Sequence, residues 1–154
     1  MKKSKIIMIV AIVILAIIAG VLGYKLYQEH KAYTVSTENT YNMAFFELVD
    51  YTQNVKTYLA KSLISTDSTH AAETLTHVWR EANLAQTYLS MLPMGSQELE
   101  NAEKFLNQVS EYSYSLSRKN INNEDLSEQD LNNLKELYNY SVNLSNVLNQ
   151  LSEE

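Results

Sequence analysis

The chain contains very few residues that break a helix. Only one proline and three glycines occur in its 154 residues, and Gly20 and Gly23 both lie near the N-terminus. A sheet protein needs frequent turns, and turns are built mainly from glycine, proline, asparagine and aspartate. The sequence therefore predicts an all-α fold of long helices joined by short connections.

The most apolar segment is residues 6–24, which carry no charge and follow the basic residues 1–5. A helix of this length is about 28 Å long, close to the hydrocarbon thickness of a bilayer. No small-x-small cleavage site follows, so we predict an uncleaved transmembrane anchor over residues 6–24 rather than a cleaved signal peptide. The predicted anchor positions are Ile6, Val10, Val13, Leu15, Ile18 and Leu22.

Lysines are slightly more frequent before the apolar segment than directly after it. Lys2, Lys3 and Lys5 precede the segment, whereas Lys25 and Lys31 follow it. This bias predicts that residues 1–5 form a cytoplasmic tail. We therefore predict a single-pass membrane protein whose residues 25–154 lie outside the cytoplasm.

The charge of the chain lies almost entirely after the apolar segment. All 18 acidic residues and nine of the 12 basic residues follow Tyr24, which leaves that part with a formal charge of −9. A negative charge of this size opposes binding to nucleic acid or to an anionic lipid surface. The chain has no cysteine. Disulfides, thiol catalysis and cysteine-ligated zinc are therefore excluded.

Apolar residues recur at spacings of three and four after residue 24, the period of an amphipathic helix. Polar runs at 65–68 and 120–125 and the Pro93–Ser96 segment interrupt the pattern. The predicted helices span residues 25–64, 68–92, 97–118 and 128–151, and the first continues the anchor. Short connections make neighbouring helices antiparallel, so we predict an up-down-up-down four-helix bundle after the anchor.

The last predicted helix has a clear start signal. Ser127 and Asp130 resemble a capping box in which aspartate replaces the usual glutamate or glutamine. The apolar stripe of this helix begins with Leu131 and Leu134 and is predicted to face the core.

His70, Glu73 and His77 share one face of the second predicted helix, where they could form a metal site. Di-metal sites in bundles use a Glu-x-x-His motif with carboxylates from facing helices, and no such motif occurs here. We therefore interpret these residues as a solvated polar face. The spacing of the other polar residues supports neither a nucleophile–base set nor a phosphate-binding loop. We predict no enzymatic activity, no cofactor and no bound metal.

Aromatic residues are the candidates for recognition. The chain has 11 tyrosines, with Tyr112 and Tyr114 close together, and one tryptophan, Trp79, followed by Arg80. Tyrosine, tryptophan and arginine are enriched at protein interfaces, but they also occupy the edge of a moderately polar core. Both interpretations, partner surface and core edge, remain open for these four residues.

Several segments occur in an order that resembles the spore germination protein YpeB family. These segments are residues 38–48, Val78–Arg80, Leu92–Pro93 and residues 105–116, and they follow a similar apolar N-terminus. The candidate family-signature or partner-binding residues within or next to them are Asn39, Tyr41, Phe45, Glu47, Trp79, Arg80, Tyr112 and Tyr114.

The resemblance implies a non-enzymatic protein of spore germination at the inner membrane of the spore, facing the cortex. It also implies a partner, the cortex-lytic peptidoglycan hydrolase SleB, which such proteins bind, stabilise or localise. Phe46 departs from the family pattern, since a polar residue, often histidine, is expected there. The PepSY-type repeats of the family are absent from the sequence, so we expect either a shortened relative or the N-terminal region of a longer protein.

A different functional class is compatible with a bundle beside a membrane anchor. Extracytoplasmic sensory or ligand-binding domains of receptors have this architecture. Such a receptor requires a second membrane span, and charged residues interrupt every apolar run after residue 24. This alternative therefore requires a truncated receptor.

Overall fold

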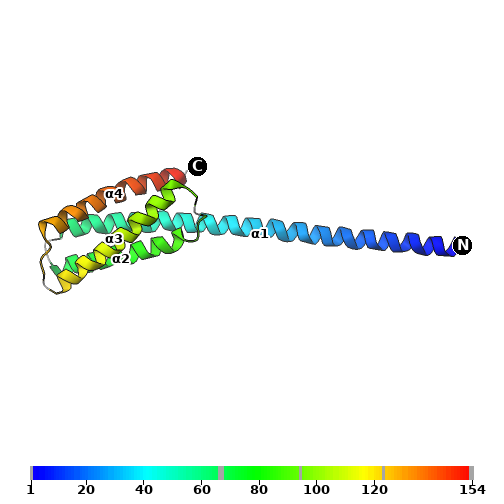
Figure 1. Ribbon diagram of the computed structural model, residues 1–154, viewed down its shortest axis with the longest axis horizontal. Helices are drawn as coiled ribbons and strands as arrows, with labels where there is room; N and C mark the ends of the chain where they lie inside the picture. Colours follow the sequence, from blue (N-terminus) through cyan, green and yellow to red (C-terminus); the bar gives the residue numbers. More distant parts are fainter. Residues whose placement is uncertain (1, 66–67, 94, 123, 153–154) are drawn as a thin grey trace. The chain divides into compact units, whose positions relative to one another are not determined.

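A computed structural model describes residues 2–65, 68–93, 95–122 and 124–152, although the side chains of residues 2–14, 16 and 68 are not described. The described part is all-helical. Four helices form it, as labelled in Figure 1: α1 (Lys2–Ile64), α2 (Ser68–Leu89), α3 (Gln97–Ile121) and α4 (Glu128–Ser152).

The predicted transmembrane anchor is wrong. Among the residues that the structure describes, none of the helices has a stretch long and apolar enough to cross a membrane. Leu15, Ile18 and Leu22, the predicted anchor positions whose side chains are described, are exposed, and Lys25 and Glu29 follow them. Ile6, Val10 and Val13 lie outside the described side chains.

The predicted localisation is corrected for the same reason. A single-pass membrane protein with a cytoplasmic tail at residues 1–5 requires a span, and the described part of the chain contains none. The fold class is accordingly a set of four helices consistent with a helical bundle, without the predicted anchor.

The chain divides into two compact units, Met1–Thr40 and Tyr41–Glu154. In the first unit, nearly all described side chains are exposed. Helical backbone hydrogen bonds are supplemented there by side chains, as when the Thr34 hydroxyl donates to the His30 carbonyl over 3.0 Å. The second unit contains the hydrophobic core described below.

The core of the second unit draws on all four helices. Its side chains are mainly leucine, valine and alanine, spaced three and four apart along each helix. The buried members include Leu48, Val55 and Leu59 of α1, Leu75, Val78 and Leu89 of α2, Leu106, Val109 and Leu116 of α3, and Leu134, Leu144 and Leu148 of α4. Burial of this apolar face is what stabilises helices whose intrinsic propensity is modest.

Ring contacts show how neighbouring helices of the second unit run. Tyr51 of α1 stacks on Tyr88 of α2, and seven residues farther along α1, Tyr58 stacks on His77, earlier in α2. α1 and α2 are therefore antiparallel.

The remaining pairs follow the same rule. Contacts between α2 and α3 join Trp79 with Tyr114 and Asn83 with Ser110, and those between α3 and α4 join Phe105 with Tyr140 and Tyr112 with Asn133. From Trp79 to Asn83 the chain advances along α2 while the partner on α3 moves back from Tyr114 to Ser110. The α3–α4 contacts reverse in the same way, since Tyr112 follows Phe105 but Asn133 precedes Tyr140. The four helical segments of the second unit thus alternate in direction.

Two helix ends differ from those expected from the sequence. α2 ends at Leu89 instead of residue 92, because the next residues tighten into a turn in which the Leu92 amide donates to the Leu89 carbonyl over 3.0 Å. α3 continues to Ile121 instead of residue 118, and the Asn122 amide closes it by donating to the Arg118 carbonyl over 3.1 Å.

Small hydroxyl side chains share the core with the leucines. Thr52, Ser113, Ser117, Ser141 and Ser145 are all buried. Ser145 also joins two helices, because its hydroxyl donates to the Gln53 amide oxygen over 2.8 Å. The core is therefore partly polar.

Candidate interaction surfaces

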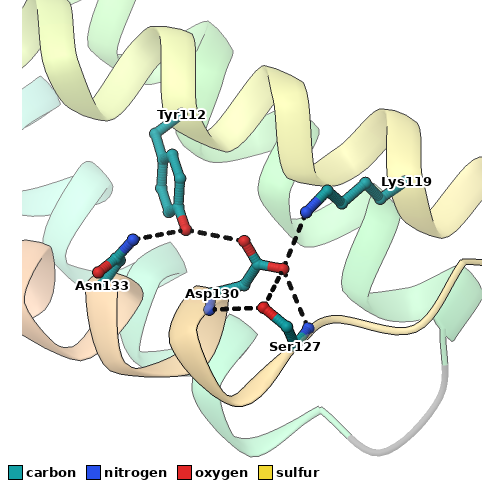
Figure 2. A network of polar contacts seen from close by, with 5 residues as sticks. All are labelled: Tyr112, Lys119, Ser127, Asp130 and Asn133. Atoms are coloured by element: carbon teal, nitrogen blue, oxygen red, sulfur yellow. Dashed lines mark hydrogen bonds and ion pairs between the residues drawn. The ribbon is translucent and has the colours of Figure 1, made fainter.

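A polar network centred on Asp130 ties the start of α4 to α3 (Figure 2). The Lys119 ammonium lies 2.9 Å from Asp130 Oδ2, and the same oxygen accepts hydrogen bonds from the Ser127 amide at 3.0 Å and the Ser127 hydroxyl at 2.8 Å. The Tyr112 hydroxyl donates to Asp130 Oδ1 over 3.0 Å and accepts from the Asn133 amide over 3.0 Å. The network surrounds the buried Asp130 with the half-buried Tyr112, Lys119 and Asn133 and the exposed Ser127.

This network contains the predicted capping box. The Ser127 hydroxyl accepts from the Asp130 amide over 3.1 Å, while the Asp130 carboxylate returns a contact to the Ser127 amide. Each residue thus satisfies an amide that the first turn of the helix leaves without a carbonyl partner. Lys119 and Tyr112 of α3 also bind the Asp130 carboxylate, so the local cap becomes a contact between two helices.

Electrostatics within the network favour an ionised Asp130. Burial alone raises the pKa of the Asp130 carboxyl, but the hydrogen bonds from Lys119, Ser127 and Tyr112 outweigh it and hold that pKa well below its usual range. The hydrogen bond to Asp130 raises the pKa of Lys119, and burial raises the pKa of the Tyr112 hydroxyl. The lysine and the carboxylate therefore form a charged pair at neutral pH.

A groove of about 660 Å³ lies along α3 and α4 next to this network. Its aromatic and aliphatic lining comes from Phe105, Tyr112, Leu137 and Tyr140. Its polar lining comes from Asn101, Lys104, Gln108, Glu111, Ser115, Asn133 and Glu136. The volume falls in the range of roughly 300–1,000 Å³ that is usual for small-molecule sites.

Two stacked rings form the centre of the groove. The rings of Phe105 and Tyr140 stack with centroids 4.9 Å apart and an interplanar angle of 27°. Phe105 is only 3% exposed, whereas Tyr140 remains 42% exposed. The tyrosine is thus held in place by a buried ring and is open to solvent.

A second candidate surface lies on α2 and α3. The rings of Trp79 and Tyr114 are 5.5 Å apart with an interplanar angle of 40°, and the two residues are 38% and 46% exposed. We call this pair the Trp79–Tyr114 surface. The two rings pack on one another and remain partly open to solvent, a position that fits both the core-edge and the partner-surface interpretation.

Arg80 does not pair with the neighbouring tryptophan. Its guanidinium donates from Nε and Nη2 to Glu81 Oε1 over 3.0 and 2.7 Å. Glu81 is buried, and Asn54 of α1 donates to its other oxygen over 3.1 Å. The hydrogen bonds to Glu81 raise the pKa of Arg80, and the three residues form a contact between α1 and α2.

The candidates on α1 are only partly brought together. Tyr41 and Phe45 line a hollow of about 410 Å³ with Phe46, at the end of the bundle where Leu92 and Leu151 also contribute. Glu47 is half-buried on the same helix, and Asn39 is exposed. Neither Glu47 nor Asn39 lines this hollow.

The three residues weighed as a metal site point to separate contacts. The His70 ring nitrogen lies 3.9 Å from the Glu73 carboxylate on the surface, whereas His77 stacks on Tyr58 with centroids 4.9 Å apart. In the part of the chain that the structure describes, three or more metal-binding side chains do not come together anywhere.

Sequence reasoning missed most of the groove. Phe105 and Tyr140 belong to different helices, and helical period alone does not say which face of α3 meets which face of α4. Tyr112 was a candidate, but its partner Asn133 and the Lys119 that pairs with Asp130 were not. The capping box could have pointed to Lys119, because a buried carboxylate that caps a helix needs a cation nearby.

Comparison with known proteins adds family membership to this geometry. The family model described as YpeB N-terminal matches residues 29–154. Proteins named "Sporulation protein YpeB" are 29% identical in Halalkalibacterium halodurans, 25% in Oceanobacillus iheyensis and 26% in Bacillus subtilis. These alignments cover 75%, 76% and 76% of this chain, respectively. No solved structure shows significant similarity to the chain.

The match is limited to one part of the relatives. The aligned region covers 26% of the length of each of these three proteins, so the chain corresponds to about a quarter of them. The relatives are named as sporulation proteins and not as enzymes. Since the family model covers more than half of the sequence, the chain belongs to the YpeB N-terminal family of sporulation proteins.

Proposed function

We propose that this helical domain is a non-enzymatic protein-binding module of sporulation, whose partner is an SleB-like cortex-lytic peptidoglycan hydrolase that it stabilises or localises. Membership in a family of sporulation proteins supports a role in sporulation. The partner and the binding role are the proposal itself, and the observation that carries them is the Trp79–Tyr114 surface.

Large aromatic rings held half-exposed on a helical face are typical of binding hot spots. Tryptophan and tyrosine supply a large contact area with few rotatable bonds and keep a polar atom available for hydrogen bonding. Mutual packing of Trp79 and Tyr114 reduces the entropy that either ring loses when a partner covers it. The pair is therefore pre-organised for an interface.

The charge of the chain indicates which partner surface fits. The formal net charge is −6. Complementary charge increases the association rate and disfavours acidic partners, so a basic surface on the hydrolase is expected to face the bundle.

The proposal is tested by measuring the affinity of the chain for the SleB-like hydrolase of the same organism by isothermal titration calorimetry. Trp79→Ala and Tyr114→Ala should each weaken binding by at least about 30-fold, the effect of losing a hot-spot residue. Tyr33→Ala removes an exposed tyrosine of α1 outside this surface and should bind as the unchanged chain does.

Unchanged affinity in both aromatic variants would contradict the proposed surface. Absence of binding by the unchanged chain would contradict the proposed partner. A deletion strain whose spores keep normal hydrolase levels and normal cortex breakdown would also contradict the stabilising role.

A further inference from the structure

We propose that the groove between α3 and α4 binds a neutral oligosaccharide. This inference concerns a different face from the Trp79–Tyr114 surface and does not depend on the hydrolase partner. Four properties of the groove support it: an exposed ring on a rigid base, unused amide groups, an unfavourable charge for anions, and an elongated shape.

The exposed ring is Tyr140, whose base is the buried ring of Phe105. The face of an aromatic ring carries a partial negative charge. The flat sides of a pyranose ring present C–H groups with a partial positive charge, so sugar and aromatic rings stack face to face. Because Phe105 already orders Tyr140, stacking a sugar on it loses little side-chain entropy.

Amide side chains surround the ring. Asn101, Gln108 and Asn133 line the groove, and an amide both donates and accepts hydrogen bonds, as a sugar hydroxyl does. Asn133 is engaged within the protein, because its Nδ2 donates to the Tyr112 hydroxyl over 3.0 Å and its Oδ1 accepts from Gln129 over 2.8 Å, so Asn101 and Gln108 supply the unused groups. The Gln108 side chain is exposed and makes no hydrogen bond within the described part of the protein. The Asn101 amide oxygen accepts from Gln97 over 3.3 Å, which leaves its two N–H donors for a ligand.

The charges at the groove favour a neutral ligand. Glu111 and Glu136 contribute two carboxylates, and Lys104 contributes one ammonium group. An anionic ligand would meet a net negative potential. Hydroxyl groups of a neutral sugar can donate to the carboxylates and accept from the lysine.

The shape favours a chain of sugars over a single one. On α3 the lining runs from Asn101 to Ser115, which corresponds to roughly 20 Å along the helix axis. A peptide helix docking in a groove instead requires apolar anchors repeated along its length. Here Phe105 is buried, and Tyr112 and Leu137 are half-buried against the core, so Tyr140 is the one large apolar side chain of the lining that is exposed. A single exposed ring suits stacking by a sugar better than a row of helix anchors.

The test is a titration of the ¹⁵N-labelled chain, followed by amide chemical shifts, with three probes. The first is the β-1,4-linked tetramer of N-acetylglucosamine, the second is cellotetraose, and the third is a basic peptide of similar length. We expect saturable shifts in groove residues with at least one tetramer. Binding of both identifies the sugar ring as the recognised group, whereas binding of the first alone identifies the acetamido sugar.

Variants localise the site. Tyr140→Ala should weaken binding by up to about tenfold through loss of stacking, and Gln108→Ala should weaken it through loss of hydrogen bonds. Gln108 is exposed, so its variant should fold normally even if the loss of the Tyr140 ring disturbs packing. Tyr33→Ala, outside the groove, is the matched control and should bind normally.

Three results would overturn the inference. They are absence of shifts with either tetramer at millimolar concentration, shifts confined to residues away from the groove, and binding that neither Tyr140→Ala nor Gln108→Ala weakens. Selective binding of the basic peptide would assign the groove to a protein partner instead. None of these results would affect the hydrolase measurements on Trp79 and Tyr114.

Discussion

Lys119 of α3 and Asp130 of α4 form an ion pair across the connection between the two helices, with 2.9 Å between Nζ and Oδ2. The carboxylate is also the side chain that caps α4. One residue therefore serves both the start of a helix and its attachment to the neighbouring helix.

Removing the charge of this carboxylate should destabilise the domain. Asp130→Asn leaves Lys119 without its counter-ion and weakens the cap at Ser127, so we expect a loss of about 1–3 kcal/mol in the free energy of unfolding. Urea denaturation followed by far-UV circular dichroism measures this loss. Asp125→Asn alters an exposed carboxylate of the same connection and should change the free energy by less than about 0.5 kcal/mol. Equal effects in the two variants would exclude the role assigned to Asp130.

The same pair predicts how stability depends on pH. The pKa of Asp130 in the folded protein lies below its value of about 3.9 in an unfolded chain. The stabilisation is therefore fully present above about pH 5 and is lost as the pH falls toward the folded pKa. The difference in unfolding free energy between the unchanged chain and Asp130→Asn should shrink from pH 7 to pH 3. A difference that stays constant over this range would show that ionisation of Asp130 is not its source.

The Trp79–Tyr114 contact should contribute to stability as well as to binding. A double-mutant cycle with Trp79→Ala and Tyr114→Ala should give a coupling energy of about 0.5–1.5 kcal/mol, the usual value for an aromatic pair. Thermal or urea unfolding of the four proteins provides the measurement. Additive effects of the two substitutions would mean that the rings do not pack on each other in solution.

Two leucines one turn apart can test which face of α4 packs against the core. Leu134 is fully buried, whereas Leu131 is 43% exposed. Leu134→Ala should cost about 2–5 kcal/mol because it leaves a cavity, and Leu131→Ala should cost less than about 1 kcal/mol. The opposite ranking in urea denaturation would place the other face of α4 against the core.

A buried hydroxyl offers a route to higher stability. Thr52 is fully buried, and its hydroxyl has no hydrogen-bond partner in the described part of the chain. Thr52→Val keeps the shape and removes the unsatisfied group, so the free energy of unfolding should rise by about 1 kcal/mol. Thr57→Val is the control, since that exposed hydroxyl bonds to the Gln53 carbonyl. A lower melting temperature for Thr52→Val would indicate that the hydroxyl is satisfied in solution.

Helix caps could be predicted from the sequence, because they are formed by residues close together in the chain. The Pro93–Ser96 segment was expected to separate two helices, and the Ser96 hydroxyl there caps α3 by accepting from the Leu99 amide over 3.3 Å. The capping box of Ser127 and Asp130 is likewise present. These interactions span three residues, so sequence spacing alone defines their geometry.

Contacts between helices could not be predicted from the sequence in this way. Leu131 was assigned to the core stripe, but it is exposed and the neighbouring Asp130 is buried, because Lys119 balances the charge of Asp130 and Tyr112 donates a hydrogen bond to it. The stacking of Phe105 on Tyr140 depends on the facing of two helices. The anchor prediction relied on the charge-free apolar run at residues 6–24, its basic flank and the lack of a cleavage site, and it is contradicted within the described residues.

Asp130 also has a kinetic consequence. It is separated from Lys119 by 11 positions in the sequence, whereas Gln53 and Ser145, which join α1 to α4, are 92 positions apart. Closing the shorter loop costs about 2 kcal/mol less in chain entropy. We therefore expect the α3–α4 hairpin to form early and α1 to dock late, so that in stopped-flow refolding Asp130→Asn slows folding while Ser145→Ala mainly accelerates unfolding.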